Sequence, residues 1–383
     1  MKTAWLGGIM AAICSLAFVP ANDVAEAKTT AEDSLALYSK FDFIPGTEIL
    51  YSNEFEQENL GEFPTGWNTT GSGEVVQFGA DKRYGVKLLQ NAQFLTDNVK
   101  EFSSDFTLEF DLFLDFTSNN AFFPVVSFGI VASGSVKPAD RSLLNSYYQG
   151  SYWLTNLSAQ LEGNSQLTLE SFQNGSVFFH SGEKPYPKLE NKLKQQVHVS
   201  VQVQKERIRL WLDENKVLDL PKALPANTKW NQLMFAVSES SYSDQEIGVY
   251  VSKIKIAKGV EDTRKKLLDE GKYSTNGILF DVNSAVIRPE SYPILKEIAQ
   301  AMLAKPETKF NIIGHTDSDG DEALNQKLSE QRAEAVKKAL IERFKIDADR
   351  LNTAGKGETA PIAENSTREG KAKNRRVEFI KLP

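Results

Sequence analysis

The sequence predicts two domains of different fold class, joined by a charged segment. Over residues 45–258, apolar and polar residues alternate in run after run, turn residues separate the runs, and no convincing helix intervenes. This pattern favours an antiparallel β-sandwich of the jelly-roll type. Over residues 273–383, helical spacing alternates with short apolar runs, which favours an α+β sandwich of order β-α-β-α-β-β. Residues 259–272 form the charged connector.

The first 27 residues are typical of a secretory signal peptide. Lys2 precedes an apolar run that is too short to span a bilayer, and residues 25–27 (Ala-Glu-Ala) offer the small-x-small pattern that signal peptidase needs. The only cysteine, Cys14, lies in this run, and the bulky residue before it disfavours lipidation. We expect cleavage after residue 27, a polar linker over 28–44, and a mature chain without cysteine or transmembrane segment.

The clearest alternation in the first domain lies over residues 106–116. Every second residue is apolar, while Glu109 and Asp111 fall on the opposite face. A half-buried strand is therefore expected, with one face in the core and the other toward solvent. Further strands are expected over 197–203 and 248–256, and a hairpin over 208–220 with its turn at 213–216.

The second domain is expected to place two helices on one face of a small sheet. Pro289 opens the first helix and Pro306 ends it, because proline fits the first turn of a helix but not its interior. The spacing over 322–344 predicts a second helix, whose buried face we assign to Leu324, Leu328, Ala335, Ala339 and Leu340. Strands are expected over 309–313, 351–354 and 377–380.

A series of short motifs runs through the second domain in a fixed order. It comprises 280–284 (Phe-Asp-Val-Asn-Ser), 314–317 (Gly-His-Thr-Asp), Asn325 with 328–333, 355–358, and 374–377 (Asn-Arg-Arg-Val). On these motifs, residues 272–383 resemble the peptidoglycan-binding domain of the OmpA family. The resemblance implies a periplasmic protein of a Gram-negative envelope, attached to the cell wall and associated with the outer membrane.

The chemistry of that ligand points to particular residues. A diaminopimelate centre in a peptidoglycan stem carries an ammonium and a carboxylate on one carbon, which an acid and an arginine fork recognise best. Asp317 follows a strand and Arg332 lies on the next helix, so both can converge at the mouth between sheet edge and helix. The resemblance implies that these two contact the diaminopimelate centre, with Asn283 close by and Thr316 and Asn325 in support. The alternative is an ion pair that merely ties the loop to the helix.

The remaining motif residues are assigned from local geometry. Arg375 and Arg376 alternate across a strand, so one can face the site while the other faces solvent, and we assign Arg376 to the site. His315 is expected to be a hydrogen-bonded loop residue. With three well-separated histidines we expect no metal site, and no cofactor. A net charge of −7 without a basic stripe disfavours nucleic-acid binding.

The first domain more loosely resembles concanavalin A-like and laminin-G-like β-sandwiches, on residues 64–67, the 106–116 strand and the hairpin that contains Trp211. Glycan binding would use aromatic platforms. A laminarinase-type glucanase is the enzymatic alternative, but its carboxylate pattern begins at Glu109 and Asp111 and lacks the third acid. A protein-interaction module is the third interpretation. The candidate aromatic residues for a glycan are Trp67, Phe113, Tyr147, Tyr148, Tyr152 and Trp153.

Taken together, these patterns predict a non-enzymatic envelope protein. We expect it to bind peptidoglycan through residues 273–383 and to present the β-sandwich to a glycan or an envelope protein. A stator-like membrane subunit would share the second domain, but it would need a retained membrane helix near the N-terminus.

Overall fold

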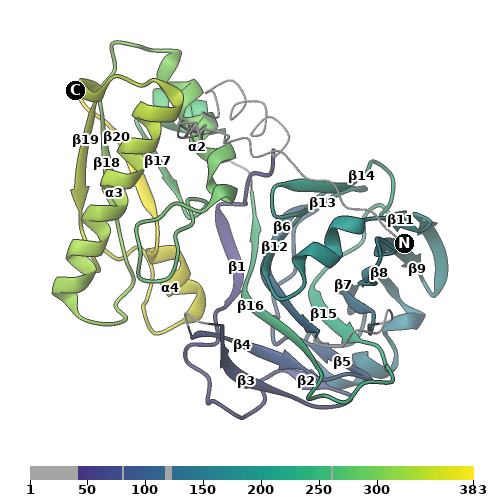
Figure 1. Ribbon diagram of the computed structural model, residues 1–383. Helices are drawn as coiled ribbons and strands as arrows, with labels where there is room; N and C mark the ends of the chain where they lie inside the picture. Colours follow the sequence, from purple (N-terminus) through teal and green to yellow (C-terminus); the bar gives the residue numbers. More distant parts are fainter. Residues whose placement is uncertain (1–41, 80–81, 117–122, 260–261) are drawn as a thin grey trace, which may run out of the picture.

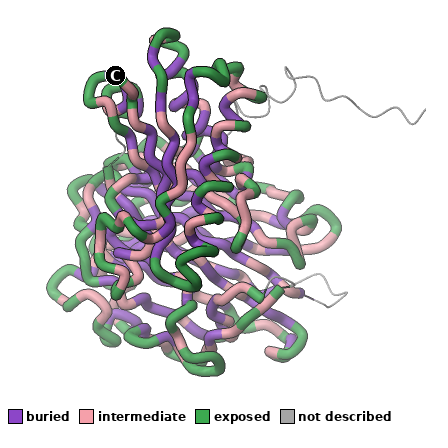
Figure 2. The backbone as a smooth tube through the Cα atoms, turned by 90° about the vertical axis from the view of Figure 1, so that its left-hand side faces the viewer, coloured by how far each residue is buried: buried purple, intermediate pink, exposed green. Residues whose placement is uncertain are grey.

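The computed structural model describes residues 42–79, 82–116, 123–259 and 262–383 (Figure 1). The predicted signal peptide, Cys14 and residues 28–41 of the predicted linker lie outside the described residues. Two main hydrophobic cores are present, one built from residues between 50 and 256 and the other from residues between 267 and 379. Figure 2 shows buried backbone running through the middle of the molecule, with exposed backbone in the peripheral loops.

The first core lies between two antiparallel sheets, each of eight strands. The first sheet has the order β14-β13-β12-β6-β16-β4-β3, and β1 also pairs with β16. Its strands are β1 Glu48–Asn53, β3 Gly73–Phe78, β4 Arg83–Leu88, β6 Asp105–Phe116, β12 Gln196–Gln204, β13 Arg207–Leu212, β14 Asn215–Leu220 and β16 Ile247–Lys258.

The second sheet has the order β10-β9-β8-β7-β15-β5-β2, and β11 also pairs with β9. Its strands are β2 Asn68–Thr69, β5 Ala92–Leu95, β7 Val126–Ala132, β8 Ser151–Ser158, β9 Gln166–Gln173, β10 Ser176–His180, β11 Lys184–Pro185 and β15 Gln232–Val237. Three short 3₁₀ turns lie in its loops: η1 Arg141–Asn145, η2 Tyr147–Gln149 and η3 Pro187–Lys192.

Aromatic side chains join the inner faces of the two sheets. The ring of Phe110 on β6 lies 5.0 Å from Phe128 on β7 and 5.3 Å from Phe235 on β15, measured between centroids and with edge-to-face geometry. Such interdigitation of apolar residues from facing sheets is what holds a β-sandwich together. The strands and the hairpin expected from the sequence are present, and they form antiparallel sheets.

The outer face of β6 is not exposed as the alternation predicted. Glu109 is 3% exposed and Asp111 is 2% exposed, although both point away from the sandwich core. The C-terminal domain covers this face, and its Arg288 reaches Asp111 across the boundary. Period-two alternation reports which residues share a face, but it cannot report that a second domain covers the polar face.

The C-terminal domain (Lys272–Lys381) builds a four-stranded sheet of order β17-β20-β18-β19, in which only β18 and β19 are parallel. Helices α2 and α3 pack their apolar residues with this sheet into the second core. The elements are β17 Lys272–Thr275, η5 Pro289–Ser291, α2 Tyr292–Leu303, β18 Phe310–Gly314, α3 Glu322–Phe344, η6 Ala348–Arg350, β19 Leu351–Gly355, α4 Arg368–Asn374 and β20 Val377–Lys381.

The predicted order β-α-β-α-β-β lacks one element of the observed domain. A third helix, α4, precedes the last strand; Thr367 caps it, and its polar sequence lacks the apolar spacing that would have revealed it. The 280–284 motif is a loop with one isolated bridge, Phe280 to Ile287, and the first strand is β17. The charged connector is also partly buried, because its π-helical turn η4 Lys265–Asp269 places two leucines in the second core.

Helix α3 has the predicted bounds but a different buried face. Leu324 is 67% exposed, and Leu328 and Ala335 are only half-buried. The first half of the helix buries Asn325 and Ser329 instead: Asn325 lines a polar cavity, and Ser329 packs against the glycines that end β18 and β19. Asp321 caps the helix by accepting a hydrogen bond from the backbone of Leu324. Within the described ranges, no helix is both long and apolar enough to cross a membrane.

Candidate binding site

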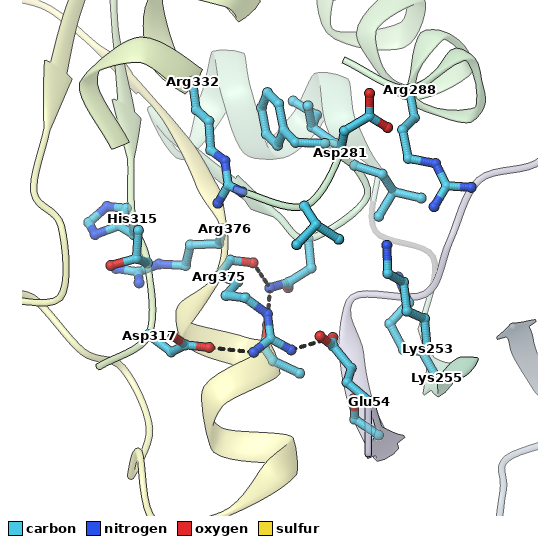
Figure 3. A pocket seen from close by; sticks show the side chains of 18 of the residues that line it. Glu54, Lys253, Lys255, Asp281, Arg288, His315, Asp317, Arg332, Arg375 and Arg376 are labelled. Carbon is cyan, nitrogen blue, oxygen red and sulfur yellow. Dashed lines mark hydrogen bonds and ion pairs between the residues drawn. The ribbon is translucent and has the colours of Figure 1, made fainter. Parts of the chain in front are cut away.

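A cavity of about 260 Å³ lies between the outer face of the first sheet and the C-terminal domain (Figure 3). The C-terminal domain lines it with the loop over 278–283, the end of β18 and the loop after it, the first half of α3, and residues 375–377. The sandwich lines it with residues after β1 and with parts of β6, β12 and β16. Carboxylates and cations from both domains therefore surround one space.

Asp317 and Arg332 both line this cavity, but no ion pair joins them among the described residues. One carboxylate oxygen of Asp317 pairs with the Arg375 guanidinium, and the other accepts a hydrogen bond from the backbone of Asp319 at 3.1 Å. Arg332 donates from Nε to the backbone oxygen of Ser284 at 3.1 Å. The structure therefore does not contain the Asp317–Arg332 ion pair that the alternative interpretation requires.

Arg332 is a half-buried cation that forms no ion pair in the part of the chain that the structure describes. Its guanidinium carbon lies 4.9 Å from the centroid of the Phe280 ring, in the loop over 278–283. Burial, and the nearby Arg375, lower the pKa of Arg332 to about 10. An anion that enters the cavity would relieve both effects, because it would neutralise a desolvated charge and offset the repulsion.

Both neighbouring arginines line the cavity, whereas alternation predicted that only one would face it. Arg375 lies in the site, where its guanidinium bridges Asp317 and Glu54 of the sandwich (Figure 3). Arg376 is 5% exposed and not solvated, and its guanidinium donates to Glu378 at 2.9 Å and to two backbone carbonyls. Alternation indicated that one arginine faces the site. Strand β20 begins only at Val377, so alternation along the strand does not choose between them.

Three other predicted site residues also line the cavity: Asn283, Thr316 and Asn325. Thr316 is 5% exposed, and its hydroxyl has no hydrogen-bond partner among the described residues. Asn325 donates to the backbone of Asp319 at 2.9 Å and to Glu358 at 2.8 Å, which holds the loop before α3 in place. Asn283 is exposed at the rim, in a left-handed conformation with φ of 50°.

His315 is a loop residue that is hydrogen-bonded through its backbone and not through its ring. The residue is 4% exposed, and its backbone N–H donates to the carbonyl of Arg376 at 3.0 Å. Neither ring nitrogen has a hydrogen-bond partner among the described residues, and Nε2 lies 3.8 Å from Glu378. The backbone of His315 therefore fixes the end of β18, while its ring lines the cavity.

A buried charge cluster forms the sandwich side of the cavity. Asp111 accepts hydrogen bonds from Gln196 at 2.7 Å and from Arg288 at 3.2 Å, and His198 Nδ1 lies 2.7 Å from its other oxygen. Burial alone would raise the pKa of Asp111, but Arg288 and His198 outweigh it and hold that pKa well below its usual range. Burial also opposes the charge on His198, yet its hydrogen bond to Asp111 and the nearby carboxylate of Glu109 raise the pKa of the imidazole to about 9.

Comparisons of the amino-acid sequence with known proteins match the C-terminal domain to a known family. The OmpA family matches residues 279–375. The probable lipoprotein YiaD of Escherichia coli is 46% identical over 108 residues, which is 28% of this chain and 49% of YiaD. The outer-membrane lipoprotein YfiB of Pseudomonas aeruginosa is 41% identical over 117 residues, 30% of this chain and 69% of YfiB. The peptidoglycan-binding protein ArfA of Mycobacterium bovis is 42% identical over 103 residues, 27% of this chain and 31% of ArfA.

The chain therefore belongs to the OmpA family through its C-terminal domain. The predicted resemblance is confirmed over residues 279–375. The chain spans about half the length of YiaD and less than a third of ArfA. The resemblance of the sandwich to concanavalin A-like domains stays a prediction.

The structure bears on two interpretations of the sandwich, glycan hydrolysis and glycan binding. Glu109 pairs with Lys255 at 3.0 Å, and Asp111 is bound by Arg288, so neither acid is free to serve as a glucanase carboxylate. The C-terminal domain covers the face beside them. Further along that face, Phe78, Phe113 and Tyr250 pack against one another and are half-buried. Of the six candidate aromatic residues, Trp67, Tyr152 and Trp153 are buried, Phe113 and Tyr147 are half-buried, and Tyr148 is 53% exposed.

Proposed function

We propose that this chain is a non-enzymatic envelope protein that binds peptidoglycan through its C-terminal domain, at the diaminopimelate centre of the stem peptide. The observation that carries the proposal is that one cavity is lined by both a cation and a carboxylate, which match the two charges of the ligand centre. Arg332 is a half-buried cation with no ion pair among the described residues, while Asp317 presents a carboxylate to the same cavity. Membership in the OmpA family and the name of ArfA support it.

The geometry suggests a role for each side chain. The planar guanidinium of Arg332 offers two parallel N–H donors to the ligand carboxylate. Asp317 keeps one oxygen whose only described hydrogen bond comes from the backbone of Asp319, so it can also accept from an ammonium. The unpartnered hydroxyl of Thr316 supplies a further polar contact. Arg375 and Asn325 hold Asp317 and its loop in place.

The cellular location belongs to the same proposal. The relatives named above include lipoproteins, and one of them is described as an outer-membrane protein. These names support a periplasmic, wall-attached protein that is associated with the outer membrane of a Gram-negative cell. We propose that the sandwich serves as an interaction module for a glycan or an envelope protein. Its edge strand β10 carries Val177, 66% exposed, and Phe178, 41% exposed, which supports the protein partner.

Retention of the full chain by insoluble peptidoglycan sacculi tests the proposal. Arg332→Lys keeps the charge but loses the fork, and Asp317→Asn keeps the shape but loses the charge. Each change is expected to weaken binding by about 1–3 kcal/mol, the range for hydrogen bonds to charged groups. Arg343→Lys is the matched control, because Arg343 lies on the same helix outside the cavity and is expected to bind normally.

Thermal melting of the same variants separates binding from folding. Both site variants are expected to remain folded. A site variant that melts much earlier, yet binds sacculi normally while still folded, would show that these residues hold the loop to the helix and do not contact the ligand.

A further inference from the structure

The cavity has a second wall that the OmpA-family motifs do not account for. On the sandwich side, β16 carries Lys253 and Lys255 into the lining, and they stand across the cavity from Arg332 in Figure 3. The pairing of β16 with β6 is interrupted by a bulge between Ser252 and Lys255. Bulges redirect a side chain out of the regular alternation of a strand. At this bulge, Lys253 has a φ of 50°, a strained conformation for a residue other than glycine.

Lys253 is not needed to neutralise its nearest acid. Its ammonium lies 3.9 Å from Asp111, beyond hydrogen-bond distance. Asp111 already receives donors from Gln196, Arg288 and His198, all at 3.4 Å or less. The neighbouring Lys255 differs, since it is closely paired with Glu109 and is less exposed. Lys253 is therefore a cation that lines the cavity and whose ammonium can donate hydrogen bonds to a ligand.

Two cations thus stand on opposite walls of one cavity. Arg332 forms no ion pair among the described residues, and Lys253 lies 3.9 Å from Asp111, an acid that three other side chains already contact. Arg332 comes from the C-terminal domain and Lys253 from the sandwich. A ligand with a single carboxylate would pair with only one of these partly buried cations. A ligand that satisfies both walls must carry at least two carboxylates, together with an ammonium for the acids Asp317, Glu54 and Glu56 that line the lower part of the cavity.

We propose that the ligand site is shared by the two domains and that Lys253 binds a second carboxylate of the stem peptide, distinct from the one that Arg332 binds. The inference rests on the proposed function and adds a specificity determinant to it. A stem peptide that ends in diaminopimelate has such groups, because the γ-linked D-glutamate and the second diaminopimelate centre each carry a carboxylate. The sandwich then selects stems whose carboxylates are free over stems in which they are amidated.

Binding of two soluble peptides to the full chain tests this. The first is L-alanyl-γ-D-glutamyl-meso-diaminopimelate. The second is the same peptide with the D-glutamate carboxyl and the peptide-linked diaminopimelate carboxyl amidated, which leaves the zwitterionic centre intact. The wild type is expected to bind the free form about tenfold more tightly, since the amide loses one charge-assisted contact. Lys253→Met is expected to weaken the free form to the level of the amidated form and to leave the amidated form unchanged.

Two control variants test whether the effect on peptide affinity is specific to Lys253. Lys258→Met changes a lysine on the same strand that lies outside the cavity, so it is expected to leave both affinities unchanged. Arg332→Lys is expected to weaken both peptides alike. Methionine keeps the length of the Lys253 side chain and faces the same backbone conformation, so the wall should retain its shape.

The possible failures are distinguishable. Equal binding of the two peptides by the wild type, equal weakening of both by Lys253→Met, or tighter binding by that variant would each overturn the shared site and leave the proposed function standing. If the wild type binds neither peptide and sacculi do not retain it, then the proposed function fails, and this inference fails with it.

Discussion

His198 is a buried imidazole held between two carboxylates. Its Nδ1 lies 2.7 Å from Asp111 and its Nε2 lies 3.7 Å from Glu109, and the residue is 4% exposed. A neutral ring could donate only one hydrogen, whereas the imidazolium can donate toward both acids. The surrounding carboxylates therefore select the charged form, despite the burial that opposes it.

This cluster predicts that stability declines at alkaline pH. Because the pKa of His198 is about 9 in the folded chain and 6.5 in the reference state, the folded chain binds the proton more tightly. The stabilisation is fully present below about pH 6.5 and is lost as the pH rises through about 9. We expect a loss of about 1–3 kcal/mol over this window in the wild type, and a flatter profile in His198→Gln. Parallel melting curves for the two proteins between pH 6 and 10 would contradict the assignment.

The sequence alone predicted the cavity residues that lie close together in the chain. Asp317, Thr316 and Arg332 fall within one strand-loop-helix unit, so motif spacing brought them to one cavity. Further cavity residues, which the sequence did not predict, lie in the other domain. Glu54 and Lys253 come from a separate domain, and no spacing rule connects them to residue 317. Their polar character was consistent with ordinary solvent-exposed positions on strands.

At the level of elements, the site depends on the close approach of β18 to α3. Gly314 ends β18, and a Cβ atom added there would lie 2.2 Å from the backbone oxygen of Ser329 on the helix. Backbone cannot move aside as a side chain can, so any larger residue would push the helix away. Arg332 lies one turn further along the same helix, and its position over the cavity follows from this contact.

Gly314→Ala is therefore expected to destabilise the C-terminal domain by about 1–3 kcal/mol, the cost of overpacking, and to weaken sacculus binding by displacing Arg332. Calorimetry of the full chain measures the first effect. Gly150→Ala is the matched control: its nearest neighbour would be a backbone oxygen at 3.4 Å, an ordinary contact, so little change is expected. A Gly314→Ala protein with wild-type stability would show that the helix can shift without cost.

Element types were easier to predict than the faces that they bury. Helix α3 was predicted at its observed bounds, because Asp321 caps it and its propensities are consistent. Its buried face was misassigned at Leu324, since the rule that apolar residues point inward fails where a helix lines a polar cavity. The same failure affected the outer face of β6. In both cases the exception lies at the candidate site.

The whole molecule is held together by ion pairs that cross between the domains. Arg288 binds Asp111, Arg375 binds Glu54, and Arg368 on α4 binds Asp97 at 2.5 Å. Helix α4 also lies against β1, so the contact extends along one side of the first sheet (Figure 1). Several of these groups are buried, and loss of one partner would leave an uncompensated charge on the other domain.

A variant in one domain should therefore destabilise the other. The described tryptophans, Trp67, Trp153, Trp211 and Trp230, all lie in the sandwich, so their fluorescence reports its unfolding alone. Arg288→Met, in the C-terminal domain, is expected to lower the stability of the sandwich by about 2–3 kcal/mol, because Asp111 stays buried with fewer partners. Arg207→Met removes an exposed pair with Asp219 within the sandwich and is expected to cost less than about 1 kcal/mol. An unchanged fluorescence transition in Arg288→Met would show that the domains unfold independently.

The bridge from Glu54 through Arg375 to Asp317 also bears on how such a chain can evolve. Envelope proteins diversify by recombination that places one wall-binding domain behind many different partners. Here Arg375 divides its guanidinium between its own domain and the sandwich, so a new partner without an acid at the position of Glu54 would leave that arginine half-paired beside the ligand. The acid at 54 and the arginine at 375 should therefore be inherited together, and lineages that exchanged the sandwich should have replaced both.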